Sequence, residues 1–228
     1  MDSILVIAAH PDDEILGCGG TIARHSEIGD LINVVIVSTG ITSRSNDIST
    51  EMHKEELEAL RLSAEKANQI IGVQRLNFLN YPDNRLDSID RLDLIKDLEK
   101  KINEFQPNIV YTHHSGDLNI DHRIVCDAVI TACRPYPNQI VKTILSFEVA
   151  SSTEWQPPSK SDAFEPNWFV DISNQLSKKL EALKEYDSEM RDWPHARSIK
   201  AIDYQAKLRG SQLGVNAVEA FKLLRNSI

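Results

Sequence analysis

Short apolar runs alternate with helix-like segments from residue 4 to residue 151. The apolar runs have the length and composition of buried strands, and they cover residues 4–9, 32–39, 75–80, 108–114 and 144–151. Between them, apolar residues recur at helical spacing, over residues 14–26, 49–72, 88–107 and 121–134. Strands and helices in alternation favour a mostly parallel sheet covered by helices on both faces. The sequence therefore predicts a three-layer α/β fold of the Rossmann-like kind.

Capping signals mark several of the expected helix ends. Ser49 or Thr50 precedes one helical segment and Ser88 precedes another, and such hydroxyls accept backbone N–H groups at a helix start. Gly72 and Pro107 stand where these segments should end.

The sequence changes character after residue 150. Residues 151–167 are rich in proline and lack periodicity, so we expect a loop there, followed by helices over 171–190 and 199–214. The run 144–151 is then the last expected strand. We expect residues 1–228 to form a single domain, with a Rossmann-like core over 1–150 and a loop-rich C-terminal lobe over 151–228 that shapes the substrate rim.

Composition narrows the class of protein. The formal net charge of -9 argues against a nucleic-acid-binding role based on phosphate neutralisation. Three cysteines without CxxC spacing indicate a reducing compartment, and no apolar run is long enough to span a bilayer. With no leader-like N-terminus, these features predict a cytoplasmic protein that acts on a small molecule. The oligomeric state stays open, with a homo-oligomer among the alternatives.

An unusual cluster of ionisable side chains follows the first expected strand. The stretch AAHPDDEILGCGG (8–20) contains His10, Asp12, Asp13 and Glu14. Helix capping explains one or two of these acids, because carboxylates are favourable in the first turn of a helix. It does not explain His10, or two aspartates placed after a rigid proline.

A second cluster follows the strand expected at 108–114. The stretch THHSGDLNIDHR contains His113, His114, Asp117, Asn119, Asp121 and His122. Ligands in open parallel sheets bind beyond the carboxyl ends of the strands, so both clusters should meet at one edge of the sheet. A polar loop with surface histidines is the alternative for either cluster alone.

Imidazole and carboxylate groups together favour a borderline divalent cation, most simply Zn²⁺, although Fe²⁺ fits the same ligands. His10, Asp13 and His122 would supply three ligands and leave a position open for water. Such water has a pKa lowered to about 7, and Asp12 is placed to accept its proton. The sequence thus predicts metal-assisted hydrolysis.

At these residues the chain resembles the PIG-L/LmbE superfamily of zinc-dependent N-deacetylases. The signature AHPDDE stands at residues 9–14, and the later histidine-bearing segment stands as DLNIDH at residues 117–122. The resemblance covers roughly the first 150 residues. It implies removal of an acetyl group from an N-acetylated amino sugar or sugar conjugate, nucleotide- or lipid-linked conjugates included.

The resemblance also implies roles for individual residues. It makes His10, Asp13 and His122 the metal ligands and Asp12 the general base. Several bacterial members have HPDH where this chain has NIDH, so Asn119 replaces a histidine.

Asn119 can donate to an oxyanion but cannot be a general acid. We expect Asp12 to protonate the leaving amine, with His113 or His114 as the alternative. Asp121 is expected to orient a ligand or a neighbouring group.

Several residues are candidates for substrate contact. Trp155 and Trp193 could stack on a sugar ring, with packing as the alternative. Arg61 lies near the place of a substrate-contacting arginine of the family, with a solvated helix face as the alternative. Asp83 follows a strand and could face the same site. The basic group of His195, Arg197 and Arg209 could meet a phosphate or pair with surface acids; the stretches PHARS and RGSQLG around it resemble deacetylases of surface-polysaccharide pathways. His113 and His114 complete the candidates.

Three rival functions remain at this stage. A zinc amidase acting on a larger acyl group or a thiol-glycoside conjugate would use the same ion chemistry. A metal-binding but inactive relative remains an alternative, because this chain has Asn119 where the family pattern has a histidine. A nucleotide-binding module is disfavoured, because HPDDEILGCGG places acids where a phosphate loop needs bare backbone N–H groups.

Overall fold

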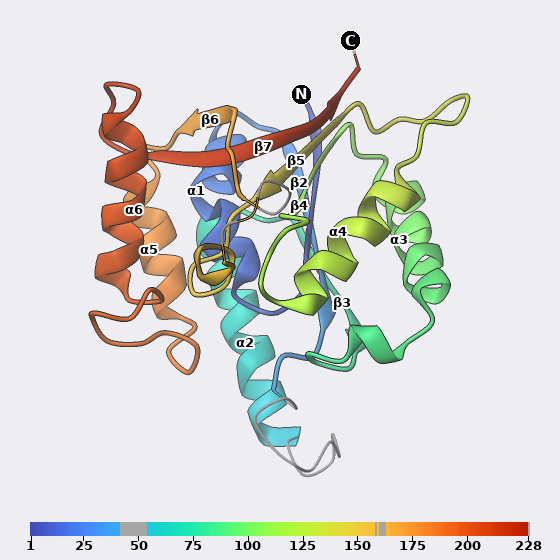
Figure 1. Ribbon diagram of the computed structural model, residues 1–228, viewed down its shortest axis with the longest axis horizontal. Helices are drawn as coiled ribbons and strands as arrows, with labels where there is room; N and C mark the ends of the chain where they lie inside the picture. Colours follow the sequence, from blue (N-terminus) through green and yellow to red (C-terminus); the bar gives the residue numbers. More distant parts are fainter. Residues whose placement is uncertain (42–53, 158, 160–162, 228) are drawn as a thin grey trace.

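A mixed sheet forms the middle of the molecule (Figure 1). The computed structural model describes residues 1–41, 54–157, 159 and 163–227. The strands in this part of the chain form a seven-stranded sheet of order β3-β2-β1-β4-β5-β7-β6. Their bounds are Ser3–Ala8 (β1), Leu31–Ser38 (β2), Arg75–Tyr81 (β3), Ile109–His113 (β4), Thr143–Phe147 (β5), Trp168–Asp171 (β6) and Val218–Asn226 (β7). Strands β1 to β5 are parallel, whereas β7 is antiparallel to both β5 and β6.

Helices cover both faces of this sheet, which confirms the predicted three-layer α/β fold. The α-helices span Asp13–Glu27 (α1), Lys54–Ile71 (α2), Arg91–Phe105 (α3), Ile120–Ala132 (α4), Leu176–Lys184 (α5) and Ile199–Ser211 (α6). Helices α1, α2, α5 and α6 lie on one side of the sheet and α3 and α4 on the other (Figure 1). Among the described residues, no helix combines the length and apolarity needed to cross a membrane.

The central strands are buried on both faces. Along β2, Val34 and Ile36 join the core beneath α1, α2 and α5, whereas Val35 and Val37 join the core beneath α3 and α4. This alternation explains the continuous apolar runs, because a parallel sheet with two covered faces has no polar side.

The predicted N-caps are partly wrong. Ser88 lies in a short 3-10 helix, Leu86–Ser88 (η2), and the cap of α3 is Asp90, whose side chain accepts the Leu92 N–H at 2.9 Å. Ser49 and Thr50 lie outside the described residues.

The expectation that 144–151 is the last strand is also wrong. Strand β5 ends at Phe147, and β6 and β7 complete the sheet. Strand β7 has the sequence VEAFKLLRN, whose interspersed charges conceal a strand from a search for apolar runs. The segment after residue 150 therefore contributes two strands to the sheet as well as loops and helices.

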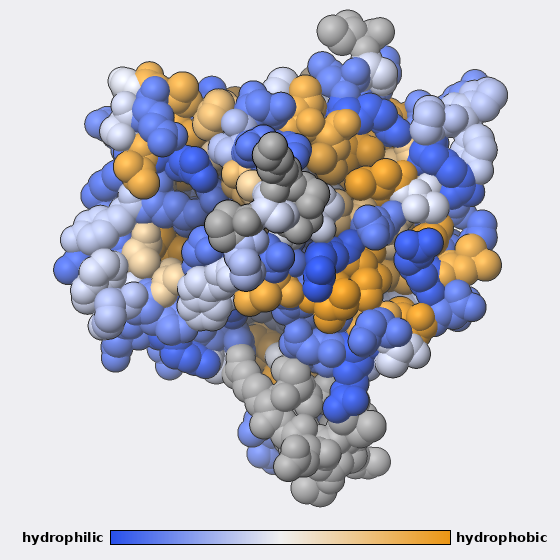
Figure 2. All heavy atoms as spheres, in the orientation of Figure 1, coloured by the Kyte–Doolittle hydropathy of each residue, from blue (hydrophilic) through white to orange (hydrophobic). Residues whose placement is uncertain are grey.

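Hydrophobic side chains gather over α4 on the face shown in Figure 2. The exposed hydrophobic residues of α4 and of the loop before it are Leu118, Ile120 and Ile130.

Candidate active site

The two polar clusters meet where β1 and β4 end. These strands are parallel neighbours, so the segments that follow them leave the sheet at the same edge. His10 comes just after β1, Asp13 begins α1, and His122 lies in the first turn of α4. Two segments separated by 112 residues are thereby brought into hydrogen-bond distance.

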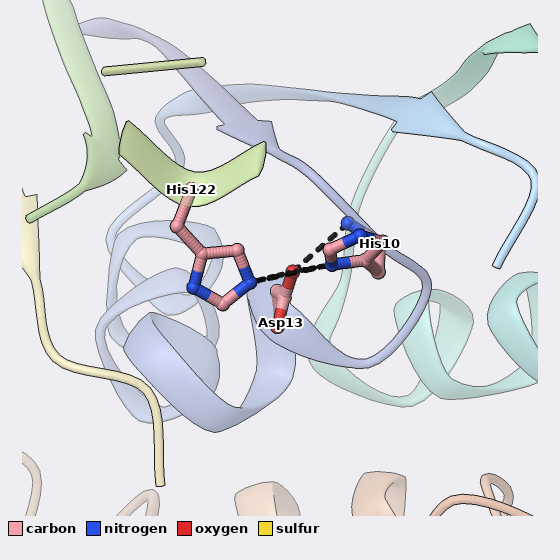
Figure 3. Close-up of side chains that lie close together, drawn as sticks. All are labelled: His10, Asp13 and His122. Carbon is pink, nitrogen blue, oxygen red and sulfur yellow. Dashed lines mark hydrogen bonds and ion pairs between the residues drawn. The ribbon is translucent and has the colours of Figure 1, made fainter. Parts of the chain in front are cut away.

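The three predicted ligands form a tight triangle (Figure 3). His10 Nδ1 and His122 Nε2 lie 3.1 and 3.2 Å from Asp13 Oδ2, and the two nitrogens are 3.3 Å apart. All three side chains are buried, with His10 9% exposed. One imidazole nitrogen from each histidine and one carboxylate oxygen thus converge on a single point.

Other carboxylates hold the far side of each imidazole. His10 Nε2 lies 3.2 Å from Asp121 Oδ2 and 3.3 Å from Asp83 Oδ1, while His122 Nδ1 lies 3.2 Å from Asp117 Oδ1. With protons on these outer nitrogens, the lone pairs of His10 Nδ1 and His122 Nε2 face Asp13. This is the arrangement in which a histidine binds a metal and a carboxylate fixes its tautomer. The donor set therefore fits a divalent cation.

Asp117 has a supporting role that the sequence did not reveal. Its carboxylate accepts hydrogen bonds from the hydroxyls of Ser152 and Thr153, the latter at 2.5 Å, and from the Asn119 N–H at 2.9 Å. Ser152 and Thr153 lie at the start of the 3-10 helix Thr153–Trp155 (η3). A recognisable signal was its place in the same His/Asp cluster, but its partners come from a segment that looked like plain loop.

The charges of this cluster shift the pKa of its members. Burial alone would raise the pKa of Asp13, but the His122 and His10 imidazoles hold it well below its usual value. Burial opposes protonation of His122, yet the Asp13 and Asp117 carboxylates raise its pKa to about 9. A cation entering the site therefore displaces a proton from His122.

Asp12 has different surroundings from its neighbour Asp13. Its backbone adopts φ 108°, and its Oδ2 accepts a 2.7 Å hydrogen bond from Arg197. Its Oδ1 is buried and has no hydrogen-bond partner among the described residues. Burial raises the pKa of Asp12 well above its usual value, against the opposing effect of Arg197. One oxygen is thus anchored and the other is available as a proton acceptor.

Glu14 is part of the framework of this loop. Its carboxylate accepts hydrogen bonds from the Tyr186 hydroxyl at 2.6 Å, from Asn68 Nδ2 at 2.8 Å and from the Asp12 N–H at 3.1 Å. Burial raises its pKa to about 7. Glu14 therefore links α1 to α2 and to the segment after α5, and it holds the Asp12 backbone.

Asn119 and Asp121 both lie at the start of α4. Asn119 is its N-cap: Oδ1 accepts the Asp121 N–H at 2.8 Å, and Nδ2 donates to Asn84 at 2.9 Å. The amide oxygen and one of the two Nδ2 hydrogens are thus engaged, while the second Nδ2 hydrogen remains a donor. Asp121 contacts His10 and accepts the Leu86 N–H at 3.0 Å, and its orienting role stays a prediction.

The two adjacent histidines are fully buried. His113 Nε2 accepts the Ala9 N–H at 2.7 Å, and its ring stacks on His122 with centroids 4.0 Å apart. Burial and the neighbouring His122 hold the pKa of His113 well below its usual value. His114 packs edge-on against Phe164. His113 thus packs against His122 in the interior, and its contact with a substrate stays a prediction.

The remaining candidates for substrate contact lie in different parts of the fold. Trp155 is 52% exposed and packs edge-on against His195, whose Nδ1 accepts the Arg197 N–H. Because Arg197 contacts Asp12, this aromatic pair borders the site. Arg209 is bound by Glu148 in a two-pronged ion pair, so the expected basic group is already neutralised by acids.

Arg61 lies in a groove along α2. Its guanidinium stacks over Phe78 at 5.1 Å and donates to Asn80. The groove has a volume of about 740 Å³ and is lined by Thr39, Lys54, Leu57, Glu58, Arg61, Leu62 and Glu65. Thr39 follows β2, so the groove lies beside the same edge of the sheet. Trp193 instead packs against Tyr204 of α6.

A known family model and curated relatives match this chain. The PIG-L family model, described as GlcNAc-PI de-N-acetylase, matches residues 5–133. The uncharacterized deacetylase YaiS of Escherichia coli K12 is 32% identical over 192 residues, covering 81% of this chain and 90% of that protein. Diacetylchitobiose deacetylase of Thermococcus kodakarensis is 27% identical over 224 residues, covering 91% and 79%.

A solved structure has the same fold. GalB, the 4-carboxy-2-hydroxymuconate hydratase of Pseudomonas putida KT2440, matches with a TM-score of 0.79 and 22% identity, covering 100% of this chain and 98% of that one. This likeness concerns architecture alone.

Proposed function

The chain belongs to the PIG-L family, and from this membership we propose that it is a metal-dependent N-deacetylase of amino sugars. It hydrolyses the acetamide of an N-acetylated amino sugar or sugar conjugate to acetate and a free amine. The convergence of His10, Asp13 and His122 at 3.1 to 3.3 Å carries this proposal on the structural side.

We assign Zn²⁺ to the three ligands, with Fe²⁺ as the alternative. When bound, such an ion polarises the acetamide carbonyl and lowers the pKa of a water molecule. Asp12 Oδ1 accepts the proton of the attacking water, while Arg197 keeps Oδ2 in place. Asp12 then returns that proton to the leaving amine, because the amide of Asn119 cannot act as a general acid.

The substrate side of the proposal rests on residues around the site. The Thermococcus relative is a diacetylchitobiose deacetylase by name, which supports an N-acetylated sugar as the substrate. We assign ring contact to Trp155 and contact with polar substituents to Arg61. Residues 151–228 act with the core as one domain and contribute Trp155 to this rim. Arg197 holds the Asp12 carboxylate in place and is not assigned a contact with the substrate.

We also propose a cytoplasmic location and a homo-oligomeric state. Three buried, unpaired cysteines support a reducing compartment. The exposed apolar residues Leu118, Ile120 and Ile130 support association, which light scattering of the purified protein would test.

The decisive experiment combines metal analysis with acetate release. The purified protein is expected to contain about one divalent ion per chain and to release acetate from N-acetyl sugars, sugar nucleotides or thiol glycosides in a panel. Chelation should abolish the activity and Zn²⁺ or Fe²⁺ should restore it. Acyl release only from conjugates with larger acyl groups would identify the amidase instead. Hydration of 4-carboxy-2-hydroxymuconate, the substrate named for the GalB neighbour, without acetate release from any sugar would contradict the proposal.

Two variants separate the assigned roles. Asp12→Asn should retain the ion but lose about 100- to 10,000-fold in kcat, which is the usual contribution of a general base. His122→Ala should lose the ion. Full activity in Asp12→Asn would show that Asp12 is not the general base. A wild-type protein that binds metal but releases no acetate would indicate a non-catalytic relative.

A further inference from the structure

Helix α1, which begins with the ligand Asp13, is broken after its first turn. Cys18 has φ -147° and ψ 22°, far from helical values. An unbroken helix would join the Gly20 N–H to the Leu16 carbonyl, four residues earlier. The break separates these two groups in the interior of the protein, where an unsatisfied backbone group is costly.

A buried ion pair occupies the place of that missing hydrogen bond. Lys179 of α5 donates from Nζ to the Leu16 carbonyl at 2.8 Å, and Glu219 of β7 accepts the Gly20 N–H at 2.9 Å on Oε1. Lys179 Nζ and Glu219 Oε1 are themselves 2.6 Å apart. The second oxygen of Glu219 accepts the Thr21 N–H at 2.6 Å. Carbonyl, ammonium, carboxylate and amide thus form one continuous chain across the break.

The first turn of α1 is fixed on its other sides as well. The Cys18 thiol donates to the Glu14 carbonyl at 3.3 Å, and Glu14 is held by Tyr186 and Asn68. A Cβ atom at Gly17 would lie 2.3 Å from the Phe147 ring, so this turn packs directly against β5.

We propose that Lys179 and Glu219 are positioning residues of the metal site. They keep α1 broken, so that its first turn presents Asp12 and Asp13 toward α4 while the rest of the helix packs along the sheet. Side chains inserted into the ladder of a helix are a known cause of sharp kinks. This inference rests on the metal site assigned above.

Stability alone does not account for this pair. Lys179 and Glu219 are 4% and 5% exposed, and the desolvation of a buried pair commonly offsets its attraction. Apolar residues of similar volume would remove the acceptors and donors that hold the break open. The Gly20 N–H and the Leu16 carbonyl could then bond to each other, and the helix would close.

The test is the double variant Lys179→Met/Glu219→Leu. We expect it to fold with a Tm equal to or above that of the wild type, since such replacements are often neutral or stabilising. Its dissociation constant for Zn²⁺ should rise about 10- to 100-fold, as when other supporting contacts of a metal ligand are lost. The kcat for acetate release should fall by a similar factor, with KM little changed.

A matched control lies one residue away. Lys178 of α5 pairs with Glu27 of α1 at 2.6 Å on the surface, far along the helix from the break. The variant Lys178→Met/Glu27→Gln should leave Zn²⁺ affinity and kcat unchanged. A loss in both double variants alike would indicate a general effect of the α1–α5 contact and overturn the assignment.

The remaining outcomes are also decisive. A folded Lys179→Met/Glu219→Leu protein with wild-type Zn²⁺ affinity and kcat would overturn the inference while leaving the deacetylase proposal intact. If that variant does not fold, Lys179→Gln replaces it, and an unchanged Zn²⁺ affinity there would overturn the inference. Unfolding of both would make the pair a general stabilising contact, against our proposal. A wild-type protein that binds no metal would contradict the proposed function, and with it the inference that rests on that function.

Discussion

Asp12 and Asp13 are adjacent in the chain, but their surroundings favour opposite protonation states. Asp13 faces two imidazoles, which hold its pKa well below the usual value. Asp12 is buried beside Asp13, and burial raises its pKa well above the usual value even though Arg197 opposes this. Carboxylates with diverging pKa values are typical of sites that need one permanent anion and one proton carrier. The pair therefore suits one metal ligand and one base.

Glu14 gives a prediction about pH. Its ordinary pKa of 4.5 is raised to about 7 by burial, so the folded state binds its proton more tightly than the unfolded state. Its contribution to stability is fully present below about pH 4.5 and is lost as the pH rises through 7. Between these values, metal-free wild type should lose roughly 3 kcal/mol in free energy of unfolding relative to Glu14→Gln.

Urea unfolding of both proteins across this pH range measures the difference. The exposed change Glu181→Gln serves as the control and should show no such trend. A constant difference between wild type and Glu14→Gln would contradict the assignment of a raised pKa to this carboxyl group.

The sequence predicted the ligands more readily than their supports. His10, Asp13 and His122 were recognisable because histidines and acids at strand ends have few structural explanations. The deacetylase family was recognisable from AHPDDE, and the family match confirms it. Lys179 and Tyr186 carried no comparable signal, because a lysine and a tyrosine in a helical region usually lie on the surface. Their functional contacts exist only after distant elements pack together.

At the scale of elements, the connections between strands and helices supply most of the side chains that contact the candidate ligands. The β4–α4 loop supplies Asp117, and η3 supplies the hydroxyls that hold it. The β3–α3 connection supplies Asp83 against His10. These loops follow β3, β4 and β5, whose ends lie along one edge of the sheet. Strand β7 escaped prediction because its interspersed charges interrupt the apolar run that marks a buried strand.

The β4–α4 loop gives a second prediction. Asp117→Asn removes the negative charge beside His122 Nδ1, so His122 should become a weaker ligand. Zn²⁺ affinity should fall about 10- to 100-fold, as measured by competition with a chelating dye. The exposed Asp127→Asn change on α4 is the matched control. Equal affinities in the two variants would show that Asp117 does not support the ligand.

At the scale of the whole molecule, the candidate ligands join two halves of the central sheet. A bound ion would link the β1–α1 connection to the start of α4, across 112 residues of chain. An ion that binds only the folded state raises its stability by mass action.

This linkage predicts a thermal shift. At a free metal concentration about 100 times Kd, the stabilisation is about 2.7 kcal/mol, which corresponds to a rise in Tm of roughly 5 to 10 °C for a chain of this size. Differential scanning fluorimetry with and without chelator measures it. His122→Ala should show no shift, and a shift of equal size in that variant would place the stabilising ion elsewhere.

The strand order has a consequence for biosynthesis. A ribosome that has passed residue 122 has already made His10, Asp13 and His122, but the nascent polypeptide still lacks β7. Strand β7 inserts between β5 and β6 and brings Glu219 to the break in α1. On the role proposed for Glu219, a chain whose translation stops short of β7 carries every ligand and yet holds its cation loosely. Tight binding of the cation thus requires that β7 has been translated and has joined the sheet.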